Sequence, residues 1–281
     1  MSVVLSENQY GKSRVRLVKV ERQGSRHELR ELTVDIQFAG DFAAAYLEGD
    51  NRKVLPTDTM KNTVYALARQ QALGEIEDFG ARLADHFLRR SAYVGWVRVA
   101  ISENAWTRIR MGGQEHDHAF VRAGNEWRTA AIEQNRSGTG IKAGIAGLEV
   151  LKTAHSAFEN FLQDEYTTLK DTRDRLLATA VTAEWTYAGG AHDYGALWRT
   201  ARQTMLEVFA GHDSRGVQHT LYAMGEAVLK RIPAVERIEL SLPNRHCLLV
   251  DLAPFGLDNP NQVFVPTDEP HGVIVAVLTR S

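Results

Sequence analysis

The sequence of 281 residues contains a single cysteine, Cys247, so no disulfide can form within one chain. Long apolar runs are also missing, because the longest, Gly272–Leu278, is far shorter than the roughly 20 residues that a membrane-spanning helix needs. An excess of one charge is missing as well, since 33 basic residues nearly balance 35 acidic ones. A nucleic-acid partner would therefore need a local basic face that these totals do not show.

Recognisable targeting signals are absent from both ends of the sequence. Met1–Tyr10 lacks the apolar core of a secretory signal peptide, and Thr279–Ser281 does not match a peroxisomal address. A lone thiol is typical of proteins that work in a reducing compartment. These features together lead us to expect a cytoplasmic protein.

The pattern of apolar residues predicts an α+β fold with mainly antiparallel sheets. Strict alternation of apolar and polar residues predicts strands within residues 15–20, 32–38, 97–101, 181–187, 238–242 and 273–277. Apolar residues at helical spacing predict helices within residues 76–87, 194–208 and 221–232. The first two strands would form a hairpin at Gln23–Ser25, and Pro233 would end the last helix.

Strands, then helices, then strands occur twice along the chain, which predicts two tandem units, residues 1–135 and 136–281. A short similarity supports this duplication, because Thr63–Leu67 matches Thr220–Met224 position by position. Each copy is expected to open a helix, and a helix start presents free backbone N–H groups and the positive end of the helix dipole. Two equivalent helix starts would suit a flat, electron-rich ligand. Between the units, only Ser137–Gly140 is predicted to be flexible.

Two polar motifs are candidates for chemistry, and each has a structural alternative. Thr57, Asp58 and Thr59 are good N-cap residues, so their spacing favours helix capping, with a threonine proton relay as the alternative. Further on, Asn244 and His246 would share one strand face, where they could bind a small polar molecule, relay a proton or simply meet solvent. The next residue, Cys247, would point to the opposite face of the strand as a packed thiol.

A metal site or a nucleotide-binding loop is not indicated by any other motif. His116-Asp117-His118 would present two imidazoles on one strand face, but the sequence offers no Cys cluster or HExxH to complete the ligands. We interpret this segment as a polar turn before a strand. The glycines of residues 138–147 lack GxGxxG spacing, and no P-loop or GxSxG elbow is found. We therefore expect no metal and no cofactor.

Several motifs in the same order resemble the uricase, or urate oxidase, family along nearly the whole chain. The motifs are Tyr10-Gly11-Lys12, Thr57-Asp58-Thr59, Lys61–Ala66, Gly147–Lys152, Asp164–Lys170, Asp174-Arg175, Val217-Gln218, and Leu242-Pro243-Asn244 with His246. The resemblance implies a tunnelling fold, in which two tandem units each pack helices on one face of an antiparallel sheet. It also implies a homotetramer with active sites shared between subunits.

The resemblance assigns catalytic roles to three residues and implies a reaction without a cofactor. Lys12 and Thr57 would form a proton-relay dyad, with His246 beside it. Deprotonated urate is electron-rich enough to reduce dioxygen itself, so the protein would deprotonate, orient and desolvate its substrate. The implied products are 5-hydroxyisourate and hydrogen peroxide.

The resemblance also assigns a substrate-binding set, namely Thr57, Asp58, Phe158, Arg175, Val217, Gln218 and Asn244. Arg175 and Gln218 would grip the ring edge, and Phe158 would stack on its face. Backbone N–H groups of Thr57 and Val217 would add hydrogen bonds, and Asn244 would hold dioxygen or water. Urate is planar and anionic, so a guanidinium fork and an aromatic face suit it. Taken alone, Arg175 is also compatible with a surface ion pair beside Asp174, and Phe158 with a core position.

The residues alone also allow two other functions for this set. One is a different purine- or pterin-binding enzyme of the same fold, such as a cyclohydrolase or an aldolase, although a zinc-dependent cyclohydrolase would need a Cys/His ligand set. The other is a ring-shaped protein that binds a purine without turning it over, for which loss of Lys12 or Thr57 would be expected. The chain also departs from some uricases in its shorter C-terminal tail.

Overall fold

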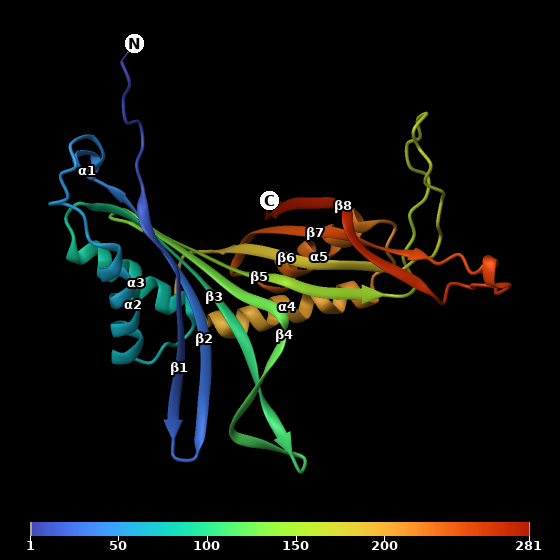
Figure 1. Ribbon diagram of the computed structural model, residues 1–281, viewed down its shortest axis with the longest axis horizontal. Coiled ribbons are helices and arrows are strands. Elements are labelled where there is room, and N and C mark those ends of the chain that lie inside the picture. Colours follow the sequence, from blue (N-terminus) through green and yellow to red (C-terminus); the bar gives the residue numbers. More distant parts are fainter. Residues whose placement is uncertain (1, 281) are drawn as a thin grey trace. The chain divides into compact units, whose positions relative to one another are not determined.

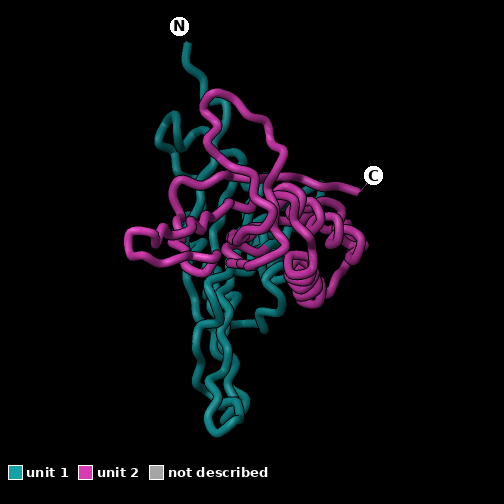
Figure 2. Tube along the Cα trace, turned by 90° about the vertical axis from the view of Figure 1, so that its right-hand side faces the viewer, with its two compact units in different colours: residues 1–144 teal, residues 145–281 magenta. Residues whose placement is uncertain are grey.

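A computed structural model of the chain describes residues 2–280. Two units of the chain divide between Gly144 and Ile145 (Figure 2). Within each unit the strands lie in chain order, and paired neighbours run antiparallel. The boundary that we place between residues 135 and 136 lies at a turn between two strands and stays a prediction.

The first unit pairs four long strands and carries three helices (Figure 1). Its elements are β1 (Tyr10–Gln23), β2 (Arg26–Gly40), α1 (Ala43–Leu47), α2 (Thr57–Gln70), α3 (Ile76–Arg90), β3 (Val94–Met111) and β4 (Gln114–Asn135), and β5 (Gly138–Lys152) runs across the boundary. The predicted hairpin is confirmed, because Gln23 pairs with Arg26 across a turn in which Gly24 has a φ of 63°. Glycine adopts this left-handed conformation without a steric penalty.

The core of the first unit lies between the sheet and its helices. On β2, the alternating residues Val34, Ile36 and Phe38 are fully buried, as the period of two predicts. Against this face, α3 packs on β3 and β4 through Phe79 and Phe87, while α2 packs on β1 (Figure 1). These contacts place α2 and α3 on one face of the sheet (Figure 1).

The second unit repeats the pattern with three strands and two long helices. Its elements are β6 (Leu177–Tyr187), α4 (Tyr194–Gly211), α5 (Val217–Arg231), β7 (Val235–Leu249), the short 3-10 helix η1 (Ala253–Phe255) and β8 (Phe264–Thr279). The predicted alternation on β6 is confirmed, since Val181, Ala183 and Trp185 are buried. α5 packs on β7 and β8 and also contacts α4. As expected, α5 ends before Pro233, which cannot continue the hydrogen-bond ladder of a helix.

Three local expectations differ from the structure. The full extents of the two strands of residues 114–135 and 138–152 were not predicted. The segment Ser137–Gly140, expected to be flexible, forms a tight turn and the first residues of β5. Thr63 and Thr220 lie inside α2 and α5, not at their starts. Across residues 2–280, no helix combines the length and apolarity needed to cross a membrane.

Candidate functional site

Backbone hydrogen bonds tie three loop segments of the second unit together around Ser156 and Phe158. The N–H of Phe158 donates to the carbonyl of Thr172 at 2.7 Å, and the N–H of Arg175 donates to the carbonyl of Ser156 at 2.8 Å. On the other side, Ser156 forms a parallel bridge with Ser214. This arrangement brings the segments that carry Phe158 and Arg175 to the turn that precedes α5.

The guanidinium of Arg175 lies over the ring of Phe158, with its central carbon 5.3 Å from the ring centre. Burial lowers the pKa of Arg175, and its Nε atom is buried without a hydrogen-bond partner among the described residues. Among residues 2–280 the alternative ion pair with Asp174 is not found, since only burial shifts the pKa of Arg175, and the carboxylate of Asp174 accepts the N–H of Ser156 at 3.5 Å. A buried, unmatched donor on a cation suits an anionic acceptor from outside the chain.

The ring of Phe158 is half-buried rather than part of the core. Phe161 stacks on it, with ring centres 5.0 Å apart and ring planes inclined by 10°. On another side lies Gly216, where an added Cβ would sit 3.5 Å both from this ring and from the side-chain oxygen of Gln218. Phe158, Arg175 and Gln218 therefore gather around one small region.

The first turn of α5 leaves backbone donors free for a ligand. Gly216 occupies the N-cap position, and no side chain caps the helix. The first helical hydrogen bond runs from the N–H of Thr220 to the carbonyl of Gly216 at 3.2 Å. The N–H groups of Val217 and Gln218 precede this bond, so they have no acceptor within the helix. A helix start of this kind attracts negative charge.

Asn244 and His246 extend the core face of β7 beyond its last buried residue. Alternation along the strand places both on the face that carries the buried Leu242. His246 lines a cavity of about 320 Å³ together with Thr179. β6, the partner of β7, begins two residues after Arg175, so these groups approach the same end of the sheet.

In the first unit, Lys12 is a polar residue on the core face of a strand, as Asn244 and His246 are in the second unit. It pairs with the fully buried Ile36 on β2, so its side chain lies on the face against which the helices pack. A Cβ at Gly11 would lie 1.9 Å from the carbonyl oxygen of Ile36, so only glycine permits this close strand pairing. The register shifts directly after Lys12, and such bulges re-aim side chains near functional sites.

The start of α2 is held against β1 without a side-chain cap. Pro56 takes the N-cap position and no side chain caps the helix, so the prediction that Thr57–Thr59 caps it is wrong. The hydroxyl of Tyr10 accepts the N–H of Leu55 at 3.0 Å and thereby fixes the entry to the helix against β1. The half-buried Thr57 consequently keeps its hydroxyl and its N–H available at the helix start.

The charge of Asp58 at this helix start is balanced mainly within α2. The pKa of Asp58 is lowered, chiefly by Lys61, which donates to its carboxylate at 2.5 Å, and further by the hydrogen bond from Asn62 and the charge of Lys12. The carboxylate of Asp58 is exposed and already engaged within its own helix.

Comparison with known proteins identifies the family. The family model described as Uricase matches residues 8–133 and 141–275. A uricase of Arthrobacter globiformis is 48% identical over 278 residues, which cover 99% of this chain and 90% of that protein. A uricase of Danio rerio is 39% identical over 277 residues, covering 96% of this chain and 93% of that protein. The chain belongs to the uricase family.

Solved structures of relatives match this uricase-family chain in fold. The crystal structure of the Arthrobacter globiformis uricase superimposes with a TM-score of 0.95 at 47% identity, covering 100% of this chain and 96% of that one. A urate oxidase of Bacillus sp. TB-90 superimposes with a TM-score of 0.85 at 21% identity, over 97% of this chain and 100% of that one. The predicted fold of two tandem α+β units, with helices on one face of antiparallel strands, is confirmed.

A buried pair of hydroxyls at the turn before α5 was missed by the sequence analysis. The hydroxyl of Thr220 donates to the Oγ of Ser214 at 2.7 Å, and that Oγ lies 3.0 Å from the carbonyl oxygen of Gly216. Both side chains are buried. Because serine and threonine are common in turns, no spacing in the sequence distinguishes this pair from surface residues.

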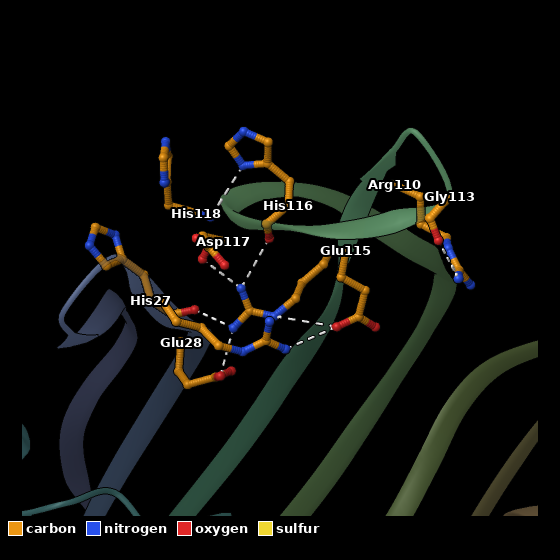
Figure 3. Close-up of polar contacts among 10 residues, drawn as sticks. His27, Glu28, Arg110, Gly113, Glu115, His116, Asp117 and His118 are labelled. Carbon is orange, nitrogen blue, oxygen red and sulfur yellow. Dashed lines mark hydrogen bonds and ion pairs between the residues drawn. The ribbon is translucent and has the colours of Figure 1, made fainter.

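His116 and His118 lie within β4, so the prediction of a polar turn is wrong (Figure 3). Their ring centres are 4.6 Å apart, and His118 lies 5.7 Å from His27 of the neighbouring hairpin. The guanidinium of Arg108 donates to the carbonyl of Asp117 at 2.6 Å and pairs with Glu28 at the same distance. This cluster joins two hairpins, and among residues 2–280 no group of three metal-ligating side chains is arranged to hold an ion.

Proposed function

We propose that the chain is a urate oxidase that converts urate, dioxygen and water to 5-hydroxyisourate and hydrogen peroxide. Membership in the uricase family supports the reaction class. The observation that carries the proposal is the guanidinium of Arg175, which is half-buried over Phe158 and has an unmatched Nε donor. A planar anion would satisfy that donor, because its acceptors match the guanidinium fork.

Arg175, Gln218 and Phe158, which we call the clamp, would hold urate by its edge and its face, and two helix starts would add backbone donors. Arg175 and Gln218 would form paired hydrogen bonds with the ring edge, and Phe158 would cover one face. The backbone N–H groups of Val217 and Thr57 would add hydrogen bonds from the starts of α5 and α2, which no side chain caps. Asp58 would contribute to substrate binding through its position next to Thr57 at the start of α2.

Proton transfer would use the polar residues that continue the two core faces. Lys12 would accept a proton from urate through the hydroxyl of Thr57, with His246 beside this dyad. Asn244 would hold dioxygen, and then water, above the ring. Each partner is an ordinary hydrogen-bonding group, so their contribution comes from position and desolvation.

The proposed chemistry needs no cofactor because urate itself supplies the electrons. Two electrons and two protons pass to dioxygen to give hydrogen peroxide, and the oxygen of water adds to the ring as the new hydroxyl. The tasks left to the protein are deprotonation, orientation and exclusion of water. We also propose that the enzyme is a homotetramer in which Lys12 and Thr57 of one subunit act with Arg175 and Phe158 of another.

Ultraviolet absorbance of urate, followed in air and under argon, tests this function. The expected result is loss of urate in air, formation of an equal amount of peroxide, and no loss under argon. Prolonged dialysis against a chelator is the control for a hidden metal. Loss of activity on chelation with recovery on metal addition would overturn the cofactor-free part of the proposal, and stable urate in air would overturn the whole.

A further inference from the structure

A histidine pair lies beside the clamp but belongs to none of the groups assigned to it. The Nε2 atom of His212 lies 3.2 Å from the Nδ1 atom of His219, with ring centres 4.3 Å apart. The backbone N–H of Arg215 donates to the same Nδ1 at 3.4 Å. A backbone N–H can only donate, so Nδ1 of His219 is the acceptor and Nε2 of His212 must carry the donated hydrogen.

This pair closes the turn that leads into the substrate-binding start of α5. His212 follows the last residue of α4, and His219 lies in the first turn of α5. The buried hydroxyls of Ser214 and Thr220 hold the inner side of the turn through their 2.7 Å hydrogen bond. The histidine pair therefore fixes the outer side of the same turn, next to Val217 and Gln218.

Lys152 holds the His212 end of the pair. Its Nζ donates to the carbonyl of His212 at 2.5 Å. Burial lowers the pKa of His212, and His219 and Lys152 lower it further, against an opposing effect of Asp213. The lowered pKa favours the neutral imidazole of His212, so this ring donates to His219 as a neutral group.

We propose that His212 and His219 are positioning residues, whose hydrogen bond holds the start of α5 in the conformation that presents Val217 and Gln218 to the purine. Loss of this hydrogen bond releases the turn, so purine binding weakens independently of the Lys12–Thr57 relay. This inference rests on the proposed function, because it assigns a purine to the clamp. It makes the histidine pair part of substrate affinity and not of the chemical step.

Two substitutions of His219 separate its hydrogen bonds from the rest of its side chain. In His219→Asn, the amide oxygen takes the place of Nδ1 and accepts the same hydrogen bonds. In His219→Ala both bonds are lost. His192→Asn is the matched control, because His192 lies in another loop of the same unit, 2.8 Å from the carbonyl of Ala188.

The dissociation constant of xanthine, a purine that serves here as a non-reacting probe, is measured for the full-length protein at about pH 8, where an ordinary imidazole is neutral. His219→Ala is expected to bind about fivefold more weakly, the loss expected for one hydrogen bond, while His219→Asn and the control bind like wild type.

The proposal is overturned if His219→Asn binds xanthine as weakly as His219→Ala, or if His219→Ala binds like wild type. Backbone hydrogen exchange of the peptide spanning residues 212–218 provides a readout without any ligand. Exchange should be faster in His219→Ala than in wild type and His219→Asn, and equal rates would also overturn the proposal. If wild type neither binds xanthine nor oxidises urate, the proposed function fails, while the exchange rates still judge the histidine pair.

Discussion

The guanidinium carbon of Arg175 lies 5.3 Å from the centre of the Phe158 ring, and no carboxylate of the described chain pairs with this arginine. Arg173, two residues earlier, has the opposite environment. Its side chain is 92% exposed and lies 3.4 Å from Glu159. One short segment thus presents one arginine to solvent and keeps another available for a ligand.

Arg175→Ala is expected to weaken binding of xanthine about 100-fold, because a charge-assisted, partly buried hydrogen-bonding group is lost. Equilibrium titration of the purified protein measures this. Arg173→Ala is the matched control and should bind within twofold of wild type, since exposed ion pairs contribute little. Equal losses in both variants would show that the segment, and not the Arg175 guanidinium, determines affinity.

Lys12→Met and Thr57→Ala are expected to lower kcat by at least about 100-fold while changing xanthine binding only a few-fold, as for a proton relay. Steady-state kinetics and the same titration separate the two effects. Lys61→Met is the control, because Lys61 pairs with Asp58 on the same helix but is not assigned to the relay. A loss of xanthine binding as large as the loss of kcat would contradict this division of roles.

The stability of the first unit is expected to fall as the pH rises through neutrality because of Glu77. Its carboxylate is fully buried in the first turn of α3, and burial raises its pKa from 4.5 to about 7, against the opposing charge of Arg128 at 2.7 Å. A raised pKa means that the folded state binds the proton more tightly than the unfolded state. The contribution is therefore fully present below about pH 4.5 and is lost as the pH rises through about 7.

Thermal unfolding of wild type and Glu77→Gln across this range tests the assignment. The loss for wild type is on the order of 3 kcal/mol, from the size of the pKa shift. Glu77→Gln keeps an acceptor for Arg128 and does not titrate, so its midpoint should change much less with pH. Glu75→Gln, which alters the more exposed partner of the same arginine, should keep the wild-type slope. A wild-type slope in Glu77→Gln would show that another group controls the stability.

Two inactive variants should restore activity when they are mixed, if active sites are shared between subunits. Lys12→Met and Arg175→Ala chains are denatured together and refolded. Random pairing makes about half of all pairs mixed. In a mixed pair one site carries both lesions and the other carries neither, so about a quarter of all sites should be active. A mixture that forms folded oligomers but stays inactive would place Lys12 and Arg175 in the same site of one subunit.

The strand faces and the long helices followed from sequence because their periodicity reflects burial directly. Val34, Ile36 and Phe38 alternate in sequence and are all fully buried. The tip of the β3–β4 hairpin was missed because it has no buried face, so His116 and His118 had no apolar alternation around them. Helix capping at Thr57 was predicted from composition, but Pro56 occupies the cap and Tyr10 anchors the preceding residue from a distant strand.

The clamp itself could not be derived from local patterns. Phe158 and Arg175 lie on two loop segments and Gln218 lies in the first turn of α5, and tertiary hydrogen bonds such as that from Arg175 to Ser156 bring these segments together. Their assignment came from the resemblance to a family, and the structure adds their proximity within the second unit. The His212–His219 pair had no sequence signal, since two histidines seven residues apart across a turn are not a motif.

Simultaneous measurement of urate, dissolved dioxygen and peroxide in one reaction tests the central claim most directly. The account predicts that each urate consumed removes one dioxygen and releases one peroxide in the wild-type protein, and that Arg175→Ala at the same urate concentration shows almost none of the three changes. Loss of urate without consumption of dioxygen, or with dioxygen consumed but no peroxide released, would contradict oxidation by direct electron transfer from urate.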